Sequence, residues 1–319
     1  MFGLVQLAMR SRGSAVMVTS GVAGLAYAML LSGSGAAVLL AFPVAALMYA
    51  SAALVGLATL RNGPVEGGFM LLGVSVVVAL GLALGAGAAM AVVGLILSAW
   101  LPTLMAALWL ARTKSQGQAL AFVFGLTVVA QVLLFAIVGD PAAQMEPWFR
   151  EQWDAMRDAM RQSLSGRQQT LDVDPREVAR SVAQMMMSSW ALGVVLSLLL
   201  ARWWHARLDN PGGFGTEFRE LRLPRWLALA GIALLAGTSL VDGAMKTFLG
   251  GLSQVALLMF LFQGLAVAHG MVHQRGASRS WLIGMYILLF ILMPMSLMVI
   301  ALTGFIDHWL DYRRRAAST

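Results

Sequence analysis

Long apolar segments, separated by short polar loops, follow one another along the chain. A run of about 20 apolar residues crosses the ~30 Å hydrocarbon core of a bilayer as a helix. The runs here are continuous rather than alternating, which favours helices over the strands of a barrel. The candidate spans are Ser14–Leu31, Ala36–Leu60, Gly67–Leu84, Ala88–Ala111, Ala119–Val138, Val182–Ala201, Trp226–Val241, Phe248–Met271 and Trp281–Ile306. This pattern predicts an all-α fold, a polytopic transmembrane helix bundle of eight or nine spans.

One long polar interval, residues 140–181, separates two groups of apolar segments. Within it, apolar residues recur at the spacing of one helix face; they are Phe149, Trp153, Met156, Met160 and Leu164. We therefore expect an amphipathic helix outside the membrane. Three roles are open for it: a cap over the outer mouth of the bundle, a helix lying in the membrane interface on Trp148 and Trp153, or a docking surface for a partner.

A second helix begins near the end of this interval. Asp174 suits the N-cap, Pro175 suits the first helical position, and Glu177 completes a capping box. No helix breaker follows until residues 210–213, so one long helix is expected to continue through the sixth span. The chain therefore divides into a five-span half (1–139), an extracytoplasmic helical insert (140–181) and a half of three to four spans (182–319).

Composition and charge narrow the class of protein. Hydrophobic residues make up 59% of the chain and charged residues 12%, whereas a soluble globular chain carries roughly 25% charged residues. The net charge of +7 comes from short loops whose Lys and Arg alternate as expected for an inside N-terminus. No soluble domain presents a basic face, so nucleic acid is not expected as a partner. The expected partner is the lipid bilayer, and the expected location is the bacterial cytoplasmic (inner) membrane.

The last apolar segment leaves the side of the C-terminus open. A full ninth span would place Arg313, Arg314 and Arg315 outside, against the positive-inside rule. Pro294 lies in the middle of this segment, where it removes a helix hydrogen bond. The alternative is a broken or re-entrant hairpin that returns the tail to the cytoplasm.

Few polar or aromatic residues within the spans are candidates for binding a substrate. Gln131, Gln254 and Gln263 lie inside apolar segments, where a polar group usually faces the bundle interior or a cavity. Trp190 lies in the sixth span and is a candidate for the lining of a cavity near the outer mouth. Bonding between helices is the alternative role for the glutamines.

The loop before the seventh span contains the basic residues Arg219, Arg222 and Arg225, which are candidates for contact with lipid headgroups or a partner protein. His269 and His273 share one helix face and are weak candidates for a metal site. No third ligand stands at a fixed spacing, and the chain has no cysteine, so neither a metal nor a cofactor is predicted.

Four stretches of the chain carry a resemblance. They are Phe42-Pro43, the elbow Asn210–Trp226, Gln263–Val267 and Gly304–Arg313. Their order resembles the YybS-like family of uncharacterised bacterial polytopic membrane proteins, which is distantly similar to the substrate-binding S components of energy-coupling-factor transporters. The resemblance implies a role in the uptake of a small solute. S components typically have six spans, fewer than this chain, and the resemblance assigns no binding residue here.

Three functions remain open from the sequence. The first is a transport-related subunit that binds or takes up a small solute of unknown identity. The second is a non-transport scaffold or envelope-biogenesis partner, which implies a membrane protein partner. The third is an intramembrane enzyme, although no catalytic motif is present. A cavity near the outer mouth favours the first, a fully packed bundle favours the second, and convergence of His269, His273 and Asp307 favours the third.

Overall fold

The computed structural model describes residues 2–31, 37–83, 89–163, 174–278 and 280–313. Within these residues the secondary structure is helical and contains no strand, which confirms the all-α class. The helices are α1 (Phe2–Ala8), α2 (Arg12–Leu31), α3 (Ala37–Asn62), α4 (Pro64–Ala83), α5 (Ala89–Thr113), α6 (Gln116–Val138), α7 (Pro141–Ser163), α8 (Pro175–Asp209), α9 (Gly213–Arg219), α10 (Arg225–Leu240), α11 (Gly243–Gln274), α12 (Ser280–Ile291) and α13 (Met295–Leu310).

The long helix expected to start at Asp174 is present as α8. The Asp174 side chain accepts a hydrogen bond from the backbone N–H of Arg176 at 2.9 Å, and Pro175 occupies the first helical position. Without a breaker, α8 continues for 35 residues to Asp209. At 1.5 Å per residue it is about 52 Å long, which exceeds the ~30 Å hydrocarbon core. The helix therefore extends beyond the apolar segment that the sequence marks as a span.

Among the described residues, four helical segments are long and apolar enough to cross a membrane. They are Phe42–Asn62, Gln116–Val138, Pro175–Asp209 and Gly243–Gln274. Their outward faces are apolar: on α6, for example, Val129, Leu133 and Ile137 are all exposed at a spacing of four residues. Such a stripe is expected where a helix meets lipid. The total number of spans stays a prediction.

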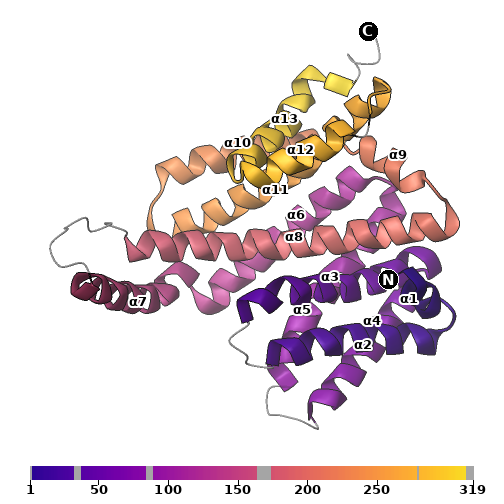
Figure 1. Ribbon diagram of the computed structural model, residues 1–319, viewed down its shortest axis with the longest axis horizontal. Helices are drawn as coiled ribbons and strands as arrows, with labels where there is room; N and C mark the ends of the chain where they lie inside the picture. The colour runs from indigo at the N-terminus through magenta and orange to yellow at the C-terminus, as the bar shows by residue number, and fades with distance from the viewer. Residues whose placement is uncertain (1, 32–36, 84–88, 164–173, 279, 314–319) are drawn as a thin grey trace.

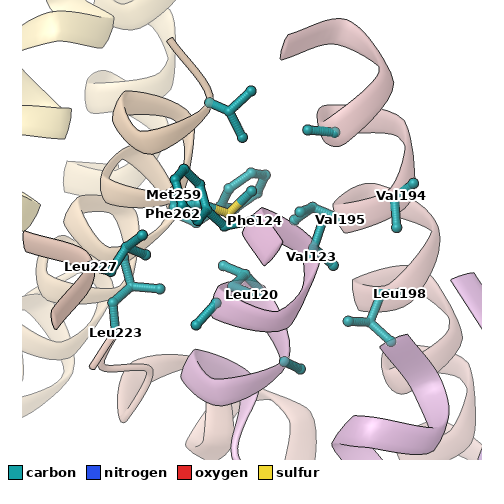
Figure 2. Close-up of a cluster of buried hydrophobic side chains, with 14 of the residues drawn as sticks. Leu120, Val123, Phe124, Val194, Val195, Leu198, Leu223, Leu227, Met259 and Phe262 are labelled. Carbon is teal, nitrogen blue, oxygen red and sulfur yellow. The ribbon is translucent and has the colours of Figure 1, made fainter. Parts of the chain in front are cut away.

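The helices pack around two hydrophobic clusters. One is formed by α1 to α5 together with Ala201 and Trp204 of α8. The other is formed mainly by α6, α8, α10 and α11, and Figure 2 shows α6 between α8 and α11 with its side chains inserted on both sides. The labelled side chains are Leu120, Val123, Phe124, Val194, Val195, Leu198, Leu223, Leu227, Met259 and Phe262. Because α8 contributes to both clusters, it joins the two parts of the bundle; the division of the chain at 139 and 181 stays a prediction.

Loops that the charge pattern assigns to one side of the membrane lie at one end of the bundle, here called the inner end. Arg61 of α3 pairs with Asp209 of α8 at 3.2 Å, and Arg12 of α2 pairs with Glu66 of α4. In Figure 1, α1 and α9 lie at this inner end, and α7 lies at the opposite, outer end. The grouping agrees with the predicted topology, while the side of the membrane on which each end lies stays a prediction.

The last apolar segment forms a hairpin rather than one continuous helix. It is interrupted at residues 292–294, which include Pro294, and α12 has only 12 residues, about 18 Å. The Tyr286 hydroxyl of α12 lies 3.4 Å from the His269 ring of α11, near the inner end. Arg313, just after α13, contacts Gly270 of α11 and the loop before α10. Thus the end of α13 lies near the inner end, as the re-entrant alternative expects, while the choice between that alternative and a ninth span stays a prediction.

The helix of the insert, α7, packs against the outer end of α8. Phe149 and Trp153 are partly buried, whereas Trp148 and Met156 are exposed. The side chain of Met160 and residue Leu164 lie outside the described residues. The inward residues suit a cap on the bundle and the outward ones suit a membrane interface, so the choice between these roles stays a prediction.

Candidate functional site

A cavity of about 320 Å³ opens in the outer half of the bundle between α2, α3, α5 and α8. We call it the outer cavity. Its wall is formed mostly by apolar groups, including Met48 and Val194, and it also contains three serines and Tyr49. The serines are Ser98, Ser189 and Ser197. No charged residue lines it among the described residues.

Trp190 forms part of the wall of the outer cavity, as the sequence had suggested. Its indole N–H donates a hydrogen bond to the backbone carbonyl of Ser98 at 3.0 Å, which ties α8 to α5. One turn further, Gly193 lets Tyr49 approach closely, because a Cβ at this position would lie 2.5 Å from the tyrosine ring. The hydroxyl of Ser197 is already bonded to the carbonyl of Gly193 at 2.7 Å. The cavity therefore offers apolar surface and few hydrogen-bonding groups.

The predicted glutamines do not line this cavity. Gln131 of α6 donates to the carbonyl of Phe248 on α11 at 3.0 Å. Gln254 of α11 donates to the side chain of Gln184 on α8 at 3.2 Å and lies 3.4 Å from the Ser188 hydroxyl. These contacts join helices, which is the alternative role named for them. Their sequence signal, a polar group in an apolar segment, is the same for both roles.

The third glutamine, Gln263, lies at the centre of a buried junction at the inner end. Its carbonyl accepts from the backbone N–H of Leu223 at 2.8 Å, and its amide donates to the carbonyl of Gly304 at 2.8 Å. A Cβ on Gly304 would lie 2.1 Å from the carbonyl of Phe260, so α11 and α13 touch backbone to backbone. One side chain thus joins the loop before α10, α11 and α13.

A buried ion pair completes this junction. Arg313 and Asp307 are 2.7 Å apart, and their side chains are 6% and 1% exposed. The same guanidinium donates to the carbonyls of Arg219 and Leu221 at 2.8 and 3.0 Å. The sequence analysis considered Arg313 only as a charge in the tail, and no spacing in the sequence indicated that it pairs with Asp307.

In the elbow, Asn210–Trp226, buried leucines lie beside exposed arginines. Leu221 and Leu223 are buried, and Arg222 and Arg225 are exposed. Gly212 has a φ of +92°, a conformation that glycine adopts without strain.

A polar cavity of about 560 Å³, here called the inner cavity, lies between the elbow, the end of α11 and the residues after α13. Arg219, Arg222 and Arg313 line it, and Arg225 does not.

The two histidines of α11 have different surroundings. His269 lies 2.9 Å from the carbonyl of Leu265 and makes an edge contact with Phe218, whereas His273 lines the inner cavity. No group of three His, Asp or Glu residues suited to a metal ion occurs within the described residues. Asp307 is paired with Arg313 instead.

The model of a family described as Predicted membrane protein (DUF2232) matches residues 27–308, most of the chain. The chain belongs to this family. The match includes α3 to α12 and, within α13, Gly304 and Asp307, so most of the outer cavity and most of the inner junction lie within it. The chain is therefore an integral membrane protein. No curated protein and no solved structure matches it.

Proposed function

We propose that the protein is a transport-related membrane subunit that binds a small, largely apolar solute in the outer cavity. The observation that supports this proposal is the cavity itself, because the described bundle is not fully packed in its outer half. Its volume of about 320 Å³ is at the small end of the range for ligand pockets, about 300–1,000 Å³. The site suits a compact ligand rather than a large one.

The lining indicates the charge of the solute. An ionised group removed from water needs a partner of opposite charge or several hydrogen bonds, and the described lining provides no charged side chain. Tyr49 and Ser189 offer hydroxyl groups. A neutral molecule with an apolar body and one or two hydrogen-bonding groups fits this chemistry.

The resemblance to the YybS-like family and, through it, to S components supports uptake as the purpose of binding. It also supports location in the bacterial inner membrane. A scaffold is the second candidate, favoured by the exposed Trp148 and Met156 on α7, which offer apolar surface to a partner. The enzyme alternative loses support because His269, His273 and Asp307 have separate surroundings.

Filling the outer cavity tests the proposal. Ser189→Phe places an aromatic ring in the cavity, and Met186→Phe adds the same ring to an exposed position on the same helix. Native mass spectrometry of the purified protein in detergent should detect a copurified small molecule on the wild type and on Met186→Phe, and none on Ser189→Phe. Equal ligand occupancy in both variants would refute the outer cavity as the binding site. A wild type that carries only a protein partner would favour the scaffold.

A further inference from the structure

The inner cavity has a chemistry unlike that of the outer one. It is larger, about 560 Å³, and the residues that line it include Arg219, Arg222 and Arg313. Thr216, His273 and Gln274 add further polar groups. We propose that this cavity binds a phosphate-bearing anion, with Arg219 as its main ligand and Arg222 as the second.

The arginines differ in what they already bind. Arg313 is committed to Asp307 and to two backbone carbonyls, and it is buried. Arg222 pairs with Asp311, with side chains 51% and 31% exposed. Exposed pairs of this kind contribute little to stability, so Arg222 can exchange Asp311 for a ligand at low cost.

Arg219 is the guanidinium most available to a ligand. Its Nη2 donates to the hydroxyl of Thr216 at 3.2 Å, and it has no carboxylate partner among the described residues. Its backbone is nevertheless fixed, because its carbonyl accepts from the buried Arg313 at 2.8 Å. A fixed backbone lowers the entropy lost on binding. Arg313 therefore acts as a brace beneath the site rather than as a ligand.

The shape of the donors favours phosphate among anions. A guanidinium presents planar, paired N–H groups that match two phosphate oxygens. Glu220 and Asp311 also line the cavity and oppose a negative ligand, whereas Arg225 and Arg275 lie near the same end and favour it. The phosphate group belongs either to an anionic lipid headgroup or to a soluble compound. The elbow joins two apolar helices at the inner end of the bundle, so it is expected to meet both lipid headgroups and soluble compounds.

Two probes separate these sources. In nanodiscs of phosphatidylcholine, inorganic pyrophosphate is titrated and the thermal unfolding midpoint is followed. In detergent, native mass spectrometry measures retention of added phosphatidylglycerol. Binding of the first probe indicates a soluble phosphate, and selective retention of the second indicates a headgroup. Arg219→Gln should weaken the effective probe roughly ten- to hundredfold, as expected for the loss of a hydrogen bond between charged groups.

Two further variants give the test its controls. Arg225→Gln removes the same charge from the same elbow but not from the cavity lining, and it should leave binding within about threefold of the wild type. Asp311→Asn should tighten binding, because it frees Arg222; the residue has φ +45°, which Asn tolerates. The proposal is overturned if neither probe binds, if Arg225→Gln weakens binding as much as Arg219→Gln, or if Asp311→Asn weakens it.

Discussion

The buried pair Asp307–Arg313 allows a quantitative test of the inner junction. Arg313→Met removes the ion pair at 2.7 Å and two bonds to backbone carbonyls, and it leaves the carboxylate of Asp307 in a site where its side chain is 1% exposed. The contacts left to this carboxylate are the Tyr312 N–H at 3.1 Å and the Gln263 amide at 3.5 Å. Breaking a buried pair from one side costs about 3–5 kcal/mol.

This cost is measurable as a thermal shift in detergent. At roughly 2 °C per kcal/mol for a large domain, Arg313→Met should lower the unfolding midpoint by on the order of 6–10 °C. The scan rate is held constant, because unfolding of such proteins is often irreversible. Arg222→Met is the matched control: it also breaks an Arg–Asp pair, but an exposed one, and should shift the midpoint by about 2 °C or less.

A second substitution separates the charge from the packing. Asp307→Asn added to Arg313→Met removes the uncompensated carboxylate and keeps an acceptor for the Tyr312 N–H. The double variant should therefore be more stable than Arg313→Met alone, which is a favourable coupling between neighbouring sites. Our reasoning is wrong if Arg313→Met and Arg222→Met shift the midpoint equally, or if the double variant is less stable than Arg313→Met.

Three other predictions follow from packing and exposure. Gly304→Val should prevent folding, because a Cβ there meets the Phe260 carbonyl, and the monodisperse peak in detergent chromatography should be lost. Gly284→Val, with open space around it, should be tolerated, and equal loss in both variants would contradict the α11–α13 contact. Trp153→Glu should lower the thermal midpoint by several degrees, since the ring is partly buried, whereas the exposed Glu151→Ala should be nearly silent; equal effects would reverse the assigned faces of α7. Gln152→Cys, the sole cysteine in the chain, should react with an impermeant thiol reagent in intact cells, and labelling only after lysis would invert the topology.

Features with a local cause were predictable from the sequence. Asp174 and Pro175 define the start of α8 through their own backbone chemistry, and Pro294 interrupts the last segment because it lacks an N–H. The alternation of basic loops grouped the helix ends correctly, since Arg61 and Asp209 meet at one end of the bundle. Each of these signals lies within a few residues of the feature that it determines.

Features that depend on helix register were not predictable. Gln263 and Gln131 carry the same sequence signal, yet one organises a junction of three segments and the other links two helices. The difference is set by which helix lies opposite, and a single sequence does not encode that in any short pattern. Arg313 was likewise taken as a topological marker, because burial of an arginine depends on the position of Asp307 in the folded bundle.

Three of the four stretches that carry the family resemblance contact one another in the structure. The elbow, the segment from Gln263 and the segment from Gly304 are far apart in sequence, but Gln263 bonds to both of the others and Arg313 bonds to the elbow. Sequence patterns that are individually weak therefore describe one physical object, the inner junction. The outer cavity has no such set of polar contacts, which is why only Trp190 pointed to it.

One helix connects the two candidate sites. Trp190 and Gly193 of α8 line the outer cavity, and Arg202, further along the same helix, pairs with Glu217 of α9 in the elbow, with Nε and Oε2 2.8 Å apart. An α-helix moves largely as a rod, since hydrogen bonds between residues four apart join each turn to the next along its axis. A tilt of α8 that widened the outer cavity would therefore move Arg202 and pull on the elbow that borders the inner cavity. Coupling of this kind is reciprocal. If a ligand in the outer cavity changed the affinity of Arg219 for phosphate through α8, then phosphate at Arg219 would change the affinity of the outer cavity for that ligand by the same factor.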